Sequence, residues 1–136
     1  MTEVIKEILY ENLFELETDE SFSIALKLKN IMSEFGRLEI RENKLFTTSD
    51  GSTMILKFES IRDVDKISRI IFYFDILATS EKIKIKIAAS LNCIFKSEEK
   101  NFNSFYKLEI YPDAVEDAKD IINEEVKKIE KILGIS

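Results

Sequence analysis

Apolar residues recur with a helical period over the last part of the chain, from Pro112 to Gly134. Pro112 suits the first turn of a helix because its missing N–H would have no partner there, and Asp113 and Glu116 have the spacing of a capping box. Gly134 follows where a left-handed C-cap is expected. The apolar positions form one stripe: Val115, Ala118, Ile122, Val126, Ile129 and Leu133. The pattern predicts a long amphipathic helix that packs on a surface of similar length, most simply a curved sheet.

A period of two residues, typical of half-buried strands, marks three further segments. It is clearest from Ile83 to Phe95, where odd positions are apolar and even positions as far as Asn92 are lysine, small or polar. Met54 to Phe58 alternates in the same way, and its even positions are expected to face the core. Tyr106 to Ile110 alternates directly before the closing helix, after a polar stretch from Lys96 to Asn103 that is expected to be a loop.

Two shorter strand-like runs, Leu38 to Ile40 and Leu45 to Thr47, are separated by Glu42-Asn43. Asn tolerates the positive φ that a tight hairpin requires, so the pattern predicts a turn there. A second turn is expected at Ser49 to Ser52 because Asp, Gly and Ser are common turn residues. With the Met54 strand, these runs predict a three-stranded meander.

Two segments fit both the helical and the strand period. In a helix, the apolar residues from Val4 to Leu16 would lie on one face. The second half of this segment also alternates as a strand does, and we favour the strand. Ile67 to Ala78 could follow a helix cap at Asp63, but its β-branched and aromatic residues favour a strand that turns back at Thr79-Ser80-Glu81. The polar residues Thr18 to Ser21 precede a clear helical period that ends at Gly36.

Composition narrows the class of protein. With 136 residues, of which 45% are hydrophobic and 34% charged, residues 1–136 are expected to form a single globular domain. No apolar run reaches the roughly 20 residues of a membrane span, and the start lacks a signal-peptide pattern, so we expect a cytoplasmic protein without integral membrane insertion. Heavy use of Ile, Lys and Glu is typical of a thermophile or of an AT-rich genome.

Charge and residue types exclude several kinds of chemistry. The net charge of −6 argues against non-specific nucleic-acid binding, which depends on Lys and Arg neutralising phosphates. The absence of His removes the commonest proton shuttle and transition-metal ligand. Cys93 is the only cysteine, lies on the apolar side of its strand and has no His to activate it, so we expect buried packing rather than a nucleophile.

The remaining polar candidates each have a structural explanation. The row of Lys82, Lys84 and Lys86 fits a phosphate-binding stripe, but more simply a solvated strand face. The acidic residues Asp63 and Asp65, with Glu98-Glu99, fit a divalent-metal site or surface turns, and we favour the turns. We therefore predict no catalytic residue, no metal and no cofactor.

The predicted order of strand, helix, a meander of about six strands and a long C-terminal helix resembles the helix-grip fold shared by START domains, plant pathogenesis-related allergens and polyketide cyclases. The run Leu13-Phe14-Glu15-Leu16-Glu17-Thr18, followed by the helix from Ser21, is similar to the opening of that family. The resemblance implies an α+β fold in which a curved antiparallel sheet wraps the last helix and leaves an apolar cavity. Most members lack a catalytic centre.

The resemblance implies binding or transport of a hydrophobic small molecule, such as a lipid, between the sheet and the C-terminal helix. The inward apolar positions give the expected wall residues: Phe58, Phe74, Ile87, Leu91, Tyr106, Ile122 and Val126. The alternative from the residues alone is a filled core, with apolar surface used by a homodimer or another protein partner. A cyclase-like enzyme is a third class, for which only four acid/base or polar groups are available: Tyr106, Tyr73, Asp75 and Asn12.

Overall fold

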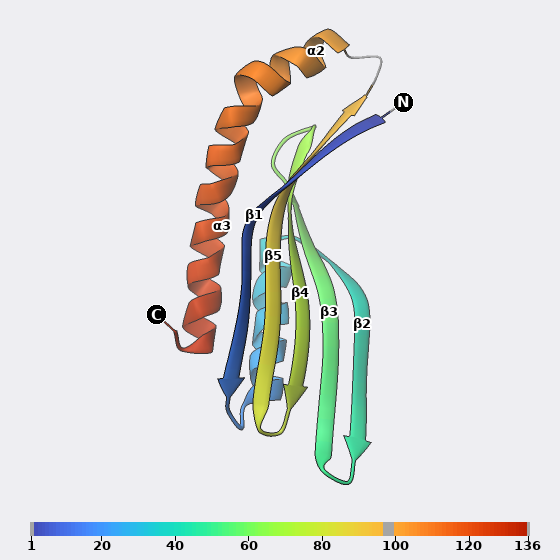
Figure 1. Cartoon of the computed structure of the whole chain (residues 1–136), viewed down its shortest axis with the longest axis vertical. Coiled ribbons are helices and arrows are strands. Elements are labelled where there is room, and N and C mark those ends of the chain that lie inside the picture. The colour runs from blue at the N-terminus through green and yellow to red at the C-terminus, as the bar shows by residue number, and fades with distance from the viewer. Residues whose placement is uncertain (1, 97–99, 136) are drawn as a thin grey trace.

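The computed structural model describes residues 2–96 and 100–135, which form one sheet and a layer of helices (Figure 1). The strands are β1 (Thr2–Glu17), β2 (Arg37–Thr48), β3 (Gly51–Asp63), β4 (Ser68–Thr79) and β5 (Lys82–Lys96). The helices are α1 (Ser21–Phe35), α2 (Lys100–Phe105), the π-helical segment η2 (Tyr106–Ile110) and α3 (Tyr111–Leu133).

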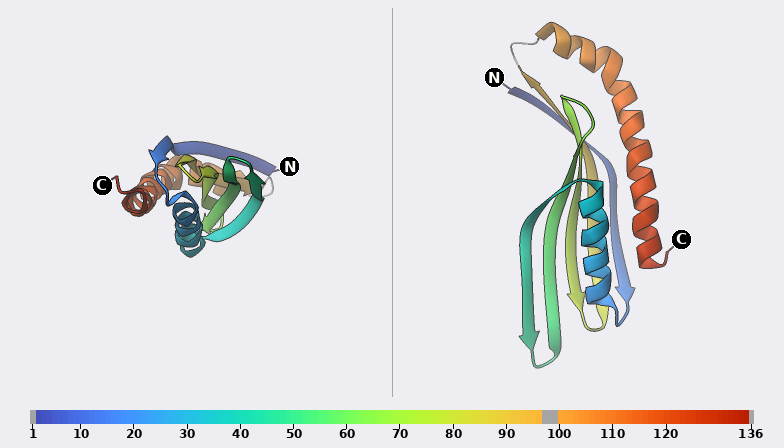
Figure 2. Two further views of the ribbon diagram at one scale, coloured as in Figure 1. Left: turned by 90° about the horizontal axis from the view of Figure 1, so that it is seen from below. Right: turned by 180° about the vertical axis from the view of Figure 1, so that it is seen from behind.

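The strands pair in the order β1-β5-β4-β3-β2, and every pair is antiparallel. The first strand of the chain therefore lies beside the last, and β1 and β2 form the two edges. The sheet twists along its length, and α1 and α3 lie on the same face of it (Figure 2). The predicted α+β class, with a curved antiparallel sheet and a long C-terminal helix, is confirmed. Within the described residues the sheet has five strands, not about six.

Both segments that fitted two periods are strands, as favoured. β1 pairs with β5 along its whole length and has one bulge, between Ile8 and Tyr10, that lets an edge strand follow the curvature. β4 lies in the middle of the sheet, and its alternate inward side chains are buried: Ile70, Phe72, Phe74, Ile76 and Ala78. The predicted turn from β4 back to β5 at Thr79-Ser80-Glu81 is also present.

β2 is one strand, so the hairpin predicted at Glu42-Asn43 is wrong. Both residues pair with β3, Glu42 with Lys57 and Asn43 with Leu56. The chain reverses only at the second predicted turn, where Gly51 has a φ of 122° that other residues rarely adopt. The period breaks near Glu42 because β2 contains a bulge, not a turn.

α1 lies across the middle of the inner face of the sheet, and its buried side includes Ile24, Ala25, Leu28, Met32 and Phe35. Two side chains of β3 donate hydrogen bonds to carbonyl groups at the C-terminal end of α1. The Ser60 hydroxyl donates to the Met32 carbonyl at 2.6 Å, and Arg62 Nε donates to the Phe35 carbonyl at 2.8 Å. A Cβ at Gly36 would lie 2.4 Å from the Ile61 carbonyl oxygen, so only glycine allows this close approach.

The strand predicted at Tyr106 to Ile110 is wrong, because α2, η2 and α3 follow one another as a bent helical run (Figure 1). β5 already has β1 and β4 as neighbours, so a strand directly after it would have no adjacent edge to join. The described part of the predicted loop, from residue 100, is helical as well. The capping box at Asp113 is absent because the helix continues from η2, whereas Gly134 is the left-handed C-cap with a φ of 74°.

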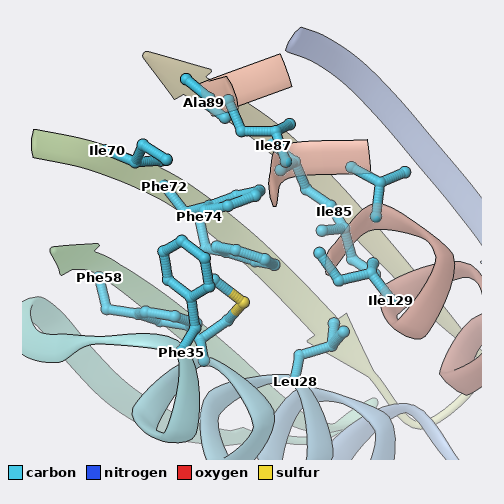
Figure 3. Close-up of a cluster of buried hydrophobic side chains, with 14 of the residues drawn as sticks. Leu28, Phe35, Phe58, Ile70, Phe72, Phe74, Ile85, Ile87, Ala89 and Ile129 are labelled. Carbon is cyan, nitrogen blue, oxygen red and sulfur yellow. The ribbon is translucent and has the colours of Figure 1, made fainter. Parts of the chain in front are cut away.

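α3 packs against β5 and α1. Two helices, α1 and α3, therefore pack on the sheet, rather than the C-terminal helix alone. Figure 3 shows the result: Leu28 and Phe35 of α1 reach the aromatic side chains of the sheet, and Ile129 of α3 joins from the other side. The rings of Phe35 and Phe72 meet edge to face at 4.9 Å between centroids, and those of Phe58 and Phe74 stack at 4.8 Å.

Candidate functional site

An apolar pocket of about 250 Å³ lies at the end of the sheet, where the β3–β4 turn meets α2 and η2. Its walls are the side chains of Ile67, Phe102, Tyr106 and Ile110, with Asp65 and Lys66 as the polar contributors. Phe102 is 48% exposed although it is a large aromatic residue. The pocket therefore contains solvent-exposed apolar surface, and a bound apolar molecule would cover that surface.

Asp65 fixes both the turn and the helix that enclose this pocket. Its Oδ1 accepts hydrogen bonds from the backbone N–H groups of Ile67 and Ser68, each at 2.7 Å. Its Oδ2 accepts a hydrogen bond from the Tyr106 hydroxyl at 2.8 Å. The Ser68 hydroxyl lies 3.1 Å from the same tyrosine oxygen. One carboxylate thus joins the β3–β4 turn to η2, and the pocket is held open between them.

These contacts shift the ionisation of the groups involved. Burial alone would raise the pKa of Asp65, but hydrogen bonds from the Ser68 and Ile67 amides and the Tyr106 hydroxyl outweigh it and lower that pKa. Burial, together with the Asp65 charge, raises the pKa of Tyr106. Burial also raises the pKa of the nearby Cys93 thiol to about 11. At neutral pH Asp65 is therefore the acceptor, and Tyr106 and Cys93 keep their protons.

Tyr106 forms part of the wall between the pocket and the protein interior. Its ring faces Phe102 of the pocket at 6.3 Å between centroids and Phe95 of β5 at 5.7 Å. The side chain is 2% exposed. Further along the helical run, Phe105 and Leu108 are 54% and 75% exposed and do not line the pocket. Of these three exposed apolar residues, Phe102 lines the pocket, whereas Phe105 and Leu108 lie outside it.

All seven predicted wall residues are buried in one hydrophobic cluster. Phe58, Phe74 and Ile87 lie side by side on β3, β4 and β5, where the register pairs each with the next (Figure 3). Leu91 lies further along β5, opposite Ile70. The remaining predicted wall residues come from the helical run: Tyr106 from η2, and Ile122 and Val126 from α3. Tyr106 alone among the seven also lines the pocket beside Phe102.

A second hollow, of about 300 Å³, lies on the outer face of the sheet around Tyr73 and Ala88. Its rim is charged, and the charges neutralise one another: Lys57 lies 3.8 Å from Asp75, and Arg41 is paired with Glu59. Lys6 Nζ lies 4.7 Å from the centre of the Tyr73 ring. Two of the predicted wall residues, Phe58 and Phe74, also line this hollow, and the paired charges lie around its rim.

The other polar candidates lie apart from the pocket. Asn12 and Asp75 are exposed, and Asn12 contacts Tyr10 within its own strand. Lys82, Lys84 and Lys86 are exposed on β5, and Cys93 is buried as expected. Across residues 2–96 and 100–135, no group of three or more His, Cys, Asp or Glu side chains is placed to hold a metal ion. Glu98-Glu99 lie outside the described residues.

Glu125 was not singled out by its sequence pattern, yet its side chain is 5% exposed on α3. Its Oε2 lies 3.5 Å from Lys128 Nζ, one turn further along the helix, while its Oε1 has no hydrogen-bond partner among the described residues. In the part of the chain that the structure describes, no helix is long and apolar enough to span a membrane.

No family model and no curated protein matches the chain. Among solved structures, a structural-genomics target from Rhizobium leguminosarum is 8% identical over 100% of this chain and 99% of its own, with a TM-score of 0.29. A point mutant of Thalictrum norcoclaurine synthase, bound to a transition-state analogue, is 10% identical over 90% of this chain and 98% of its own, with a TM-score of 0.24. The sheet and the closing helix are compatible with a helix-grip fold.

Proposed function

We propose that the protein binds a small hydrophobic molecule, and that the pocket between the β3–β4 turn and the α2–η2 helical run is where it binds. The observation that carries the proposal is the half-exposed Phe102 ring, which forms an apolar wall with Ile67, Tyr106 and Ile110. Covering such surface is favourable by about 25 cal/mol per Å² of apolar area removed from water.

The pocket volume sets the size of the ligand. About 250 Å³ exceeds the roughly 150 Å³ cavity that holds benzene and lies just below the roughly 300 Å³ at which drug-sized sites begin. A ring or a short alkyl chain fits this volume. Lys66 is exposed at the rim, where its ammonium group can meet a carboxylate on such a molecule.

The wall residues predicted from the sequence extend this proposal inward. All seven lie in the hydrophobic cluster, and Tyr106 is the one that also lines the pocket. A longer ligand that displaced Tyr106 from its hydrogen bonds to Asp65 and Ser68 would reach further into this cluster. Binding of a short molecule needs no such movement.

The test is a titration with an environment-sensitive apolar dye and with a short-chain fatty acid. Phe102→Ala removes a pocket wall and is expected to weaken binding at least about tenfold. Phe105→Ala is the matched control, since Phe105 is equally aromatic, slightly more exposed and outside the pocket. Equal loss of binding in both variants would show only non-specific adsorption to exposed aromatic rings. No saturable binding to the wild type would refute the proposal.

A further inference from the structure

β2 is a long free edge of the sheet. It lies at the end of the strand order and pairs only with β3, at the edge of the sheet away from α3 (Figure 1). Large apolar side chains along it are exposed: Ile40 at 44%, Leu45 at 65% and Phe46 at 44%. An edge of this kind presents unpaired backbone groups and apolar contacts to any strand that can align with it.

The bulge in β2 limits which strands can align. Ile40 is opposite Phe58 and Glu42 is opposite Lys57, so Arg41 is an extra residue on β2. On β2, the side chains on the inner face of the sheet therefore belong to even-numbered residues before the bulge, Leu38 and Ile40. After the bulge they belong to odd-numbered residues, Asn43 and Leu45. The alternation of faces along this edge is offset by one residue at Arg41.

A second copy of the same strand carries the same offset. Among antiparallel registers whose overlap crosses the bulge, only the one with both bulges at the two-fold axis keeps inner side chains opposite inner ones throughout. Face-matched registers that leave the bulge outside the contact pair a shorter length of β2. The register with both bulges at the axis puts Leu38 opposite Leu45 and Ile40 opposite Asn43 of the second copy. Moving the strands along by two residues would instead put Glu42, on the outer face, opposite Asn43, on the inner face.

The charges on the outer face also fit this register, which was derived only from matching inner side chains with inner side chains. Glu39 is opposite Lys44 of the second copy, and Arg41 is opposite Glu42, so every facing charged pair has opposite signs, and the two-fold axis repeats each pair. Charged edges usually prevent strand pairing by repulsion. In a single chain the same groups make exposed ion pairs, such as Lys44 with Glu42 at 3.3 Å.

We propose that two copies of this chain associate edge to edge through β2, forming one continuous antiparallel sheet across a two-fold axis. The partner is a second copy rather than an unrelated strand because the bulge and both charge pairs are self-complementary. The contact buries Leu45 against Leu38 of the other copy and leaves the Phe102 pocket open.

Sedimentation velocity of the full chain over a concentration series is the test, with circular dichroism to confirm folding. Glu39→Lys places like charges opposite each other, and so does Lys44→Glu, and each is expected to raise the dimer dissociation constant at least about tenfold. Mixing the two variants in equal amounts restores opposite charges at every pair, so a heterodimer should form. Lys84→Glu is the control, since it reverses an exposed charge on β5, away from the edge.

The heterodimer is the decisive outcome because two folding defects cannot cancel by mixing. A wild type that stays monomeric at every concentration overturns the proposal. A dimer that survives both single reversals unchanged also overturns it, since another surface would then hold the copies together.

Discussion

The Tyr106 hydroxyl lies 2.8 Å from Oδ2 of Asp65, although the two residues are 41 positions apart. This hydrogen bond joins the β3–β4 turn to the start of the closing helical run. Asp65 is partly open to solvent, so water can replace part of the interaction when it is lost. The contact nevertheless fixes where the helical run begins and which side chains line the pocket.

Removing this hydroxyl tests its contribution. Tyr106→Phe keeps the ring but leaves Asp65 and Ser68 without their shared partner, and it should lower the free energy of unfolding by about 1–2 kcal/mol. Tyr111→Phe is the control, because Tyr111 donates to Glu7 at 2.5 Å in an exposed position, where about 0.5 kcal/mol or less is expected. Urea denaturation measures both. Equal losses in the two variants would contradict the anchoring role of Tyr106.

The lowered pKa of Asp65 predicts an acid-dependent contribution to stability. A carboxyl with a lower pKa in the folded state than in the unfolded state stabilises the fold above the unfolded value, about 3.9, and this contribution is lost as pH falls through the folded value. The difference in unfolding free energy between wild type and Asp65→Asn should therefore be constant near neutral pH and shrink below about pH 4. Denaturant titrations over that range measure it; a difference that grows in acid would contradict the prediction.

The sequence predicted those elements whose period runs long enough to exclude alternatives. The strand from Ile83 to Phe95 and the helix ending at Gly134 are both present, because many side chains repeat the same preference. The five residues from Tyr106 to Ile110 are too few for their pattern to distinguish a strand from a helix. The segment is helical because β5, which precedes it, already has a strand on each side and offers no free edge. A bulge likewise looks like a turn when only the period is visible, as at Arg41.

The pocket was predictable only in part. Tyr106 was named as a wall residue because of its apolar neighbourhood, but Phe102 lies in a polar stretch that indicated a loop. Glu125 sits between apolar positions on its helix, and its burial depends on the neighbouring packing, which no local pattern encodes. The same holds for Asp65, whose partners come from the turn and from a helix far along the chain.

Side chains of α3 that reach the core should dominate the stability of the domain. Ile122 and Ile129 are each 1% exposed, and replacing either with Ala leaves a cavity that should cost about 2–5 kcal/mol. Asn123→Ala is the control on the same helix, since Asn123 is exposed and a change of about 0.5 kcal/mol or less is expected. Unchanged denaturation midpoints for both isoleucine variants would contradict the packing of α3 on the sheet.

Leu91→Trp distinguishes a ligand in the Phe102 pocket from one that reaches the interior. Leu91 is fully buried on β5 opposite Ile70, so a larger ring there should overpack the cluster and lower stability by about 1–3 kcal/mol. Because Leu91 does not line the pocket, folded Leu91→Trp protein should still bind the dye with wild-type affinity. Retained stability together with lost binding would instead show that the ligand occupies the interior, among Phe58, Phe74, Ile87 and Leu91. Dye titration and urea denaturation of the same preparation separate the two outcomes.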